Sequence, residues 1–292
     1  MEPIIGVTGG DLRQRYLAQL WIENGRNPVY GAQLCIQGGH TTEVQECSLE
    51  ELLEMAQIIA APVPFSRDGV TVTGTTMGIM DFAGSLKSGQ VVFGGLIPEQ
   101  AAKYLRRRDI RFVDYMKLEQ VALQNAVATA EGAIAEAICL WPENLAGCPC
   151  LVLGYGRCGR ILAMRLKQFG AEVSVYARRK EVRVQVKTEG LKALSQEQLG
   201  EALKKHPVLF NTIPAGVFTE ALVQCLPKEH LLLELASGQG CITRELVQQY
   251  GVNKVHCPGL PGKYAPKSSA HILFDVMLEI LENELTVKAS NS

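Results

Sequence analysis

The sequence has no excess of charge of one sign, no long apolar run and no cysteine pair with the usual metal-binding spacing. Its 29 Lys and Arg nearly balance 30 Asp and Glu, for a net charge of −1. A chain so balanced lacks the electrostatic footprint of a general nucleic-acid-binding protein. No apolar stretch approaches the roughly 20 residues that span a bilayer, so we expect no membrane partner. A strand is predicted directly at Ile4–Val7, and we expect no signal peptide before it.

The 9 cysteines are scattered and contain no C-x-x-C pair. Cys148 and Cys150 are too close together for an ordinary zinc knuckle, so we expect no metal site. An odd, dispersed set is typical of reduced thiols in a cytoplasmic protein rather than of a disulfide framework. The length of 292 residues suits two domains, each large enough for its own core.

What the chain does contain is a glycine-rich turn between a predicted strand, Cys150–Leu153, and a helical pattern that Gly170 closes. A second strand is predicted at Glu172–Tyr176. This context predicts a dinucleotide site, because a G-x-G-x-x-G turn brings backbone N–H groups and a helix N-terminus to a pyrophosphate. The predicted cofactor-binding turn consists of Gly154, Tyr155, Gly156, Arg157, Cys158 and Gly159.

The second strand ends on three cations, Arg178, Arg179 and Lys180, without an acidic residue. An NAD site usually has Asp or Glu here for the ribose hydroxyls, whereas Arg suits the 2′-phosphate of NADP. The alternative is an ordinary solvated helix start. Together with the turn, the cations favour NADP(H). Cys158 lies at a helix N-terminus, where thiol pKa values fall, but its position inside the turn predicts no covalent role.

Strands and helices alternate on both sides of this turn, which predicts an α/β fold of two Rossmann-like, doubly wound parallel-sheet domains. The first domain is predicted over residues 1–115, and a final helix, 268–287, crosses back to it. A connecting helix is predicted at 116–142, and the cofactor domain at 143–267. The turn Thr8–Asp11 is another glycine turn, but without a third glycine it predicts structure rather than a second nucleotide site.

Small and polar residues follow the later strands of the cofactor domain, where a nicotinamide ring would lie. Carboxyl ends of parallel strands share one edge of a sheet, so these residues predict cofactor-contacting walls rather than ordinary turns. They are Asn211, Thr212, Ile213, Pro214, Ala236 and Ser237.

The segment from Lys263 to His271 carries cations and hydroxyls next to a helix N-terminus, which suits a small carboxylate. Lys267 is either a substrate contact or an exposed cation, and His271 either a general base or a helix-start histidine. Glu131 is either a catalytic acid or base or a helix surface residue. The candidate catalytic residues are Glu131, Lys267 and His271, with Lys263, Ser268 and Ser269 on the substrate side.

Several of these stretches together resemble the A subunit of dipicolinate synthase from endospore-forming bacteria. The resemblance covers nearly the whole chain, and its most specific part is the run from Pro258 to Lys267. The segments 31–48 and 66–76 depart from the family. The other matching stretches are Gly9–Arg13, Thr129–Gly132, Leu153–Gly159, Asn211–Pro214 and Leu235–Gly238.

The resemblance implies an NADP-dependent oxidation of a dihydro- or hydroxytetrahydro-dipicolinate to dipicolinate, in the cytoplasm of the mother cell of a sporulating bacterium. It also implies the flavoprotein-like B subunit of dipicolinate synthase as partner, and it adds Thr129 to the substrate side. We expect a homo-oligomer. Two alternatives stay open: a 2-hydroxy-acid or shikimate-type dehydrogenase, and a non-catalytic NADP-binding subunit.

Overall fold

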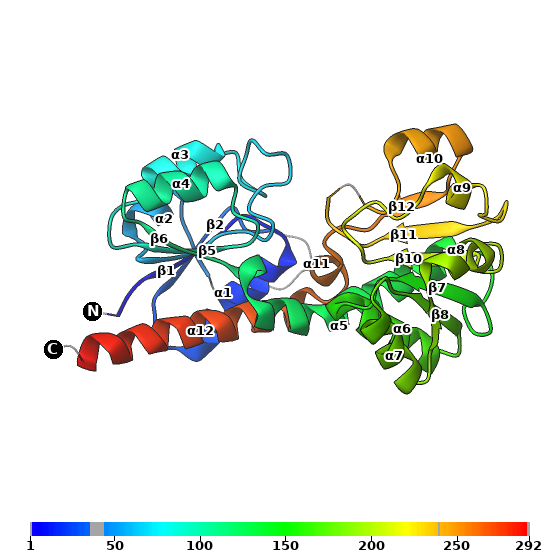
Figure 1. Cartoon of the computed structure of the whole chain (residues 1–292). Coiled ribbons are helices and arrows are strands. Elements are labelled where there is room, and N and C mark those ends of the chain that lie inside the picture. The colour runs from blue at the N-terminus through cyan, green and yellow to red at the C-terminus, as the bar shows by residue number, and fades with distance from the viewer. Residues whose placement is uncertain (1, 36–43, 239, 291–292) are drawn as a thin grey trace. The chain divides into compact units, whose positions relative to one another are not determined.

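The computed structural model describes residues 2–35, 44–238 and 240–290 (Figure 1). It divides into two compact units, of which unit 1 comprises Met1–Gln124 and Ala265–Ser292, and unit 2 comprises Asn125–Tyr264. Each unit contains one sheet, and every strand pair in the described residues is parallel. The predicted α/β fold with two Rossmann-like parallel sheets is confirmed.

The sheet of unit 1 has the strand order β3-β2-β1-β4-β5-β6. Its central strands are short runs of Ile, Val and Ala that are buried on both faces, as parallel strands between helices require. The strands are β1 (Ile5–Thr8), β2 (Val29–Ala32), β3 (Gln45–Glu46), β4 (Ile58–Ala60), β5 (Val91–Gly94) and β6 (Arg111–Asp114).

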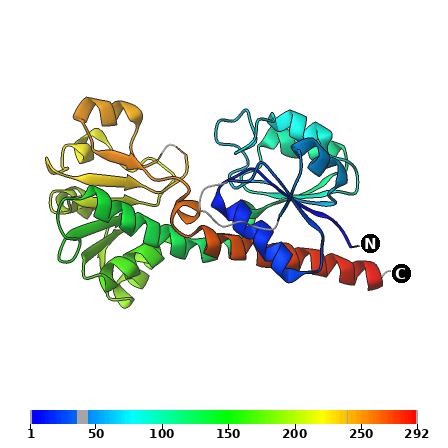
Figure 2. The ribbon, with the colours of Figure 1, turned by 180° about the vertical axis from the view of Figure 1, so that it is seen from behind.

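Helices cover both faces of this sheet because successive side chains of a strand point to opposite sides. In β4, Ile59 packs in the core with α2, α3 and α4, whereas Ile58 and Ala60 pack in the core with α1 and α12. Figure 2 shows α1 and α12 side by side, so the final helix returns to the first domain as predicted. The helices are α1 (Leu12–Asn24), α2 (Leu49–Met55), α3 (Ile79–Ser85), α4 (Glu99–Arg107) and α12 (Pro266–Ser290).

The sheet of unit 2 has the order β12-β11-β10-β7-β8-β9, so the chain leaves the middle of the sheet in both directions. This reversal between β7 and β10 is the place where open α/β sheets bind their ligands. The strands are β7 (Pro149–Leu153), β8 (Glu172–Tyr176), β9 (Lys192–Leu194), β10 (Val208–Asn211), β11 (Leu231–Glu234) and β12 (Lys254–His256).

The helices of unit 2 again form two layers. In β7, Cys150 and Val152 pack in the core with α5 (Glu119–Leu140), α6 and α7, whereas Leu151 and Leu153 face α8, α9 and α10. The helices are α6 (Arg157–Gln168), α7 (Lys180–Thr188), α8 (Gln196–Leu203), α9 (Glu220–Val223), α10 (Arg244–Tyr250) and α11 (Leu260–Tyr264).

The helix α5 (Glu119–Leu140) begins later than the predicted connecting helix, because β6 ends at Asp114 and a 3₁₀ turn, η1 (Tyr115–Lys117), follows. Asp114 accepts hydrogen bonds from the N–H groups of Leu96 and Met116, at 3.0 Å each, and so fixes this turn. Most of α5 packs within unit 2, whose core contains Ala130, Ala133 and Ala137. The unit boundary therefore lies inside the predicted connecting helix. No helix in the described ranges combines the length and apolar character needed to cross a membrane.

Candidate functional site

The glycine-rich turn joins β7 to α6 at the carboxyl edge of the unit 2 sheet. Gly154 has φ +97°, in the left-handed region that favours glycine, and a Cβ there would lie 2.6 Å from Thr212 Oγ1. A Cβ on Gly159, in the first turn of α6, would overlap with the carbonyl oxygen of Gly154. A larger residue at Gly154 would collide with Thr212, and one at Gly159 with the backbone of Gly154, so both positions require glycine.

Gly156 differs from these two glycines, because a Cβ at this position would meet no atom within 4 Å. Gly156 is the N-cap of the 12-residue helix α6, and no side chain caps this end. The N-terminus of a helix carries a partial positive charge and unsatisfied N–H groups, which suit a phosphate. The open space beside Gly156 and the uncapped helix end therefore fit a pyrophosphate.

Tyr155 fixes the turn to the connection between α7 and β9. Its hydroxyl donates to Glu189 Oε2 at 2.8 Å, and Arg160 Nε donates to the same oxygen at 3.1 Å. Burial, followed by the hydrogen bond to Glu189 and the charge of that carboxylate, raises the pKa of Tyr155. The phenol therefore stays protonated and can donate its hydrogen bond to Glu189. This bond fixes the glycine-rich turn without using a group that a pyrophosphate would need.

We expect Tyr155→Phe to lower the free energy of unfolding by about 1 kcal/mol, because a half-buried hydrogen bond to Glu189 is lost. Urea denaturation measures this change. Tyr250→Phe is the matched control, since the Tyr250 hydroxyl donates to the exposed Glu220, and its effect should be smaller. Equal losses in the two variants would contradict a special role for Tyr155.

Cys158 is half-buried near the N-terminus of α6, in contact with Thr129 of α5. The Thr129 hydroxyl donates to the carbonyl oxygen of Asn125 at 2.8 Å. Burial raises the pKa of Cys158, although the charge of Arg157 and the contact with Thr129 act in the opposite direction. The raised pKa favours the protonated thiol at neutral pH, and the absence of a covalent role stays a prediction.

Three exposed cations follow β8, as the sequence indicates: Arg178, Arg179 and Lys180. Arg179 is the N-cap of α7, and Lys180 is the first residue of that helix. Arg183, one turn into α7, donates to the carbonyl oxygens of Ala177 and Arg178 at 2.9 and 2.6 Å. This contact shapes the loop that carries the cations, and sequence reasoning had not singled out Arg183.

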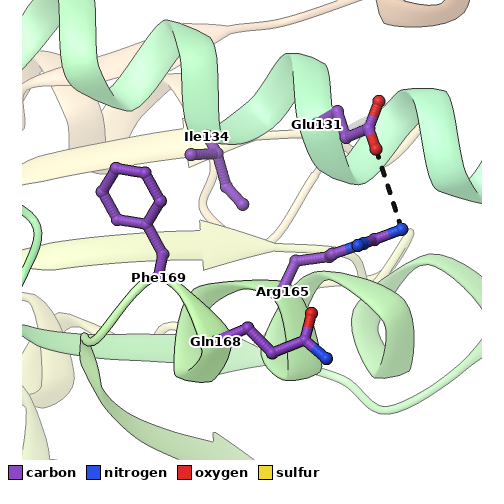
Figure 3. A pocket seen from close by; sticks show the side chains of 5 residues that line it. All are labelled: Glu131, Ile134, Arg165, Gln168 and Phe169. Atoms are coloured by element: carbon purple, nitrogen blue, oxygen red, sulfur yellow. Dashed lines mark ion pairs between the residues drawn. The ribbon is translucent and has the colours of Figure 1, made fainter.

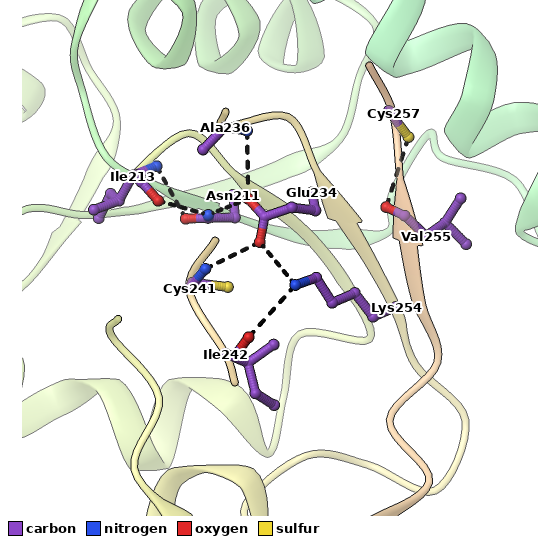
Figure 4. Close-up of polar contacts among 9 residues, drawn as sticks. All are labelled: Asn211, Ile213, Glu234, Ala236, Cys241, Ile242, Lys254, Val255 and Cys257. Atoms are coloured by element: carbon purple, nitrogen blue, oxygen red, sulfur yellow. Dashed lines mark hydrogen bonds and ion pairs between the residues drawn. The ribbon is translucent and has the colours of Figure 1, made fainter. Parts of the chain in front are cut away.

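The ends of β10 and β11 form a second group of loops at the same edge of the sheet (Figure 4). Asn211 is fully buried, and its side chain is bonded to both backbone groups of Ile213, at 3.0 and 2.9 Å. Thr212 donates to the carbonyl oxygen of Leu153 at 2.9 Å, which brings it against the glycine-rich turn. Pro214 and Ser237 are exposed, whereas Ala236 is buried. Asn211 thus shapes the turn from within.

The structure places the Glu131 carboxylate in a hollow of about 320 Å³ between α5 and α6 (Figure 3). Glu131 pairs with Arg165 at 3.8 Å, and the two side chains are 57% and 47% exposed. Phe169 and Gln168 also line the hollow. Gln168 is the last residue of α6 and Phe169 is its C-cap, more than two helical turns beyond Gly159. A catalytic role for Glu131 stays a prediction.

The segment from Lys263 to His271 is helical except at Ala265, so the final helix begins two residues before the predicted 268–287, and Lys263 belongs to a separate short helix. Lys263 lies on α11 of unit 2 and pairs with Glu136 of α5 at 2.5 Å. Lys267, Ser268, Ser269 and His271 belong to the first turns of α12, in unit 1. Ser269 is buried, whereas Lys267, Ser268 and His271 are exposed.

The first glycine turn, at the end of β1, is filled by its own chain. Gly9 and Gly10 have φ of +59° and +78°. A Cβ on Gly9 would overlap with the carbonyl oxygen of Thr73, and one on Gly10 would lie 2.5 Å from Gln14 Cγ. Asp11 caps α1 and pairs with Arg13 at 2.8 Å. These contacts explain the turn without a second nucleotide.

Comparison with known proteins matches two family models to the chain, one on each side of the start of α5. Residues 4–116 match the family model of the N-terminal domain of the dipicolinate synthase A subunit. Residues 122–256 match the NAD binding domain of D-isomer specific 2-hydroxyacid dehydrogenases. The A subunit of dipicolinate synthase from Bacillus subtilis (strain 168) is 26% identical over 283 residues, 95% of each chain.

The chain resembles the dipicolinate synthase A subunit. The crystal structure of this relative from Bacillus subtilis has a TM-score of 0.80 at 25% identity, covering 97% of both chains. The relative from Bacillus halodurans has a TM-score of 0.84 at 24% identity, covering 96% of this chain and 97% of the other. The resemblance predicted from the sequence is thereby confirmed.

The resemblance to the dipicolinate synthase A subunit and the matched NAD binding domain support an oxidoreductase with a nicotinamide dinucleotide cofactor. The open space beside Gly156 agrees with this cofactor class. Of the two segments that depart from the dipicolinate synthase pattern, 66–76 lies in the described part of unit 1. Residues 36–43 of the other lie outside the described residues.

Proposed function

We propose that this chain is an NADP-dependent oxidoreductase that forms dipicolinate from a dihydro- or hydroxytetrahydro-dipicolinate. The observation that carries the proposal is the resemblance to the dipicolinate synthase A subunit over 95% of both chains. The open space beside Gly156, which fits a pyrophosphate, supports it. The relatives are named as one subunit of a synthase, and we infer that the B subunit of such a synthase is the partner of this chain. The chemistry serves the production of dipicolinate for bacterial spores.

The choice of NADP rests on the end of β8. Arg178 and Arg179 are exposed where the ribose of a bound dinucleotide would lie. Guanidinium groups suit a dianionic phosphate, and no acidic residue stands at this strand end to receive ribose hydroxyls. Arg183 supports the choice because it holds the backbone of Ala177 and Arg178 in the loop.

The substrate carries two carboxylates, so it needs cations or helix N-termini. The first turn of the 25-residue helix α12 offers both, with Lys267 and Ser268 exposed at its start. Lys263 is already paired with Glu136, which makes it a weaker candidate. His271, exposed one turn further along α12, is the candidate general base of this segment.

A nicotinamide dinucleotide held at the glycine-rich turn would supply the oxidant, as a hydride acceptor for the partly reduced ring of the substrate. A hydroxytetrahydro-dipicolinate first loses water to give the dihydro form. Loss of a hydride and a proton from the dihydro form then yields the aromatic pyridine, so the driving force lies in the substrate. The protein contributes orientation and electrostatics.

The decisive experiment follows dipicolinate by the ultraviolet absorbance of its pyridine ring. Freshly generated dihydrodipicolinate is supplied with NADP or NAD, with this chain alone and then with the partner B subunit. We expect product formation that requires the chain and is faster with NADP. The variant Gly156→Ala, altered at the proposed pyrophosphate site, should form dipicolinate no faster than the reaction without the chain.

Two outcomes would overturn the proposal. Product formed equally fast without the chain would indicate spontaneous oxidation and a non-catalytic NADP-binding protein. Turnover of 2-hydroxy acids in a substrate panel, without dipicolinate formation, would indicate a dehydrogenase of the family that shares the NAD binding domain.

A further inference from the structure

Glu234, the last residue of β11, has a side chain that is only 2% exposed. It ends a strand, Leu231–Glu234, that is otherwise apolar and buried throughout. A carboxylate in such a place is unfavourable unless it is paired and fully hydrogen-bonded. Lys254 of β12 supplies the charge, with its Nζ 3.5 Å from Glu234 Oε2 and its side chain 17% exposed.

Both carboxylate oxygens of Glu234 receive hydrogen bonds from the loops that follow β10 and β11 (Figure 4). The Asn211 amide donates to Oε1 at 2.5 Å, and the N–H of Ala236 to the same oxygen at 3.3 Å. The N–H of Cys241 donates to Oε2 at 3.0 Å. One buried side chain therefore joins the carboxyl ends of β10 and β11 to Lys254, the first residue of β12.

The loop after β11 wraps closely around this carboxylate. Gly240 has φ +76°, and a Cβ on it would overlap with Glu234 Oε2 and lie 3.1 Å from Lys254 Nζ. A side chain at Gly240 would therefore push the loop away from Glu234, and the left-handed backbone also disfavours one. The positive φ of Gly240 and its close approach to Glu234 therefore indicate that the conformation of this loop depends on the Glu234 carboxylate.

The contacts continue from Glu234 to the glycine-rich turn. Glu234 holds the amide of Asn211, and Asn211 in turn bonds both backbone groups of Ile213. Between them, Thr212 donates to Leu153 and lies 2.6 Å from the position of a Cβ on Gly154. A change at Glu234 is thus transmitted through one short turn to the place where the pyrophosphate fits.

We propose that Glu234 is a positioning residue for the nicotinamide dinucleotide. It acts through Asn211 on the turn beside Gly154 and through the backbone of Ala236 and Cys241 on the loop after β11. Its own side chain is buried and bonded to the protein on both oxygens, so it acts through these partners. The inference rests on the dinucleotide site alone, so it is independent of the choice between NADP and NAD and of the substrate.

The test compares Glu234→Gln with Glu229→Gln, an exposed carboxylate on the loop before β11. The dissociation constants of NADPH and NADH are measured by nicotinamide fluorescence, well below the melting temperature of each variant. Gln places an amide donor among the donors of Asn211, Ala236 and Cys241. We expect both dissociation constants to rise about tenfold or more in Glu234→Gln and to stay within about twofold in the control.

A purely structural role would lower the stability of Glu234→Gln but leave the dissociation constants of the folded protein unchanged, and this result would overturn the proposal. Glu234→Asp keeps the charge and should bind the cofactor more tightly than Glu234→Gln.

If Glu234→Gln does not fold, Lys254→Met decides, because it removes only the partly exposed counter-charge. Weaker binding in Lys254→Met supports the proposal, and binding equal to the wild type overturns it. If the wild type bound neither NADPH nor NADH, there would be no dinucleotide site, and this proposal would be wrong as well.

Discussion

Replacing both Arg178 and Arg179 by Ala should weaken the binding of NADPH by about 100-fold while changing the binding of NADH less than about threefold. On the proposed assignment, each guanidinium would contribute a charge-assisted hydrogen bond to the 2′-phosphate, worth about 1.5–3 kcal/mol when the other partner is charged. NADH lacks this phosphate and loses no such contact. Fluorescence titration with both cofactors measures the two affinities.

A matched control removes two exposed cations elsewhere, by Lys103→Ala and Arg107→Ala on α4 of unit 1. The ratio of the two affinities should stay at the wild-type value in this control. An unchanged ratio in the Arg178 and Arg179 variant would show that the loop after β8 does not select the cofactor. The NADP assignment would then be withdrawn, whereas the pyrophosphate site would stand.

The second large effect is expected at the glycine-rich turn. Gly156→Ala should weaken both NADPH and NADH by about 100-fold or more, because the new methyl group occupies the space through which the pyrophosphate approaches two or more N–H donors. The free energy of unfolding should change by less than about 0.5 kcal/mol. Gly156 has φ −81°, which Ala adopts readily, and its Cβ would meet no protein atom.

Gly159→Ala provides the contrast within the same turn. Its Cβ would overlap with the carbonyl oxygen of Gly154, so the backbone must shift. We expect a loss of stability of about 1–3 kcal/mol, measured by urea denaturation. If Gly156→Ala lost as much free energy of unfolding as Gly159→Ala, Gly156 would be required for folding, and the open space beside it could not be assigned to cofactor binding.

Much of the fold could be predicted because its signals are local. The strand Glu172–Tyr176 has the predicted bounds. Ser48 and Glu51 form the capping box that starts α2, with hydrogen bonds of 3.2 and 2.9 Å. The glycine-rich turn could be predicted for the same reason, since strand, turn and helix follow one another directly in the chain.

Elements with weak local signals were missed. The helix α3 was not predicted, because its N-cap is Gly78 and no side chain caps it. The strand β3 has only two residues, both exposed. The short helices α9 and α11, of 4 and 5 residues, do not show a helical period.

The carboxylate of Glu234 was missed for a different reason. In the sequence, Glu234 is one acidic residue after an apolar run, and its four partners lie 2 to 23 residues away. Only the parallel register of β10 and β11, which pairs Asn211 with Glu234, brings the amide and the carboxylate together. A charged residue at the end of a fully buried strand was the available signal.

The return of α12 to the first sheet has a consequence for the order of synthesis. Unit 2 is continuous in the chain, whereas the core of unit 1 requires Leu273, Val276 and Met277 from α12. A ribosome that adds roughly 5–20 residues per second needs on the order of ten seconds or more to reach α12 after β6. The face of the first sheet that carries Ile5 and Val7 stays without this cover during that interval. We therefore expect the nascent chain, rather than the finished protein, to be the form most exposed to aggregation and chaperone binding.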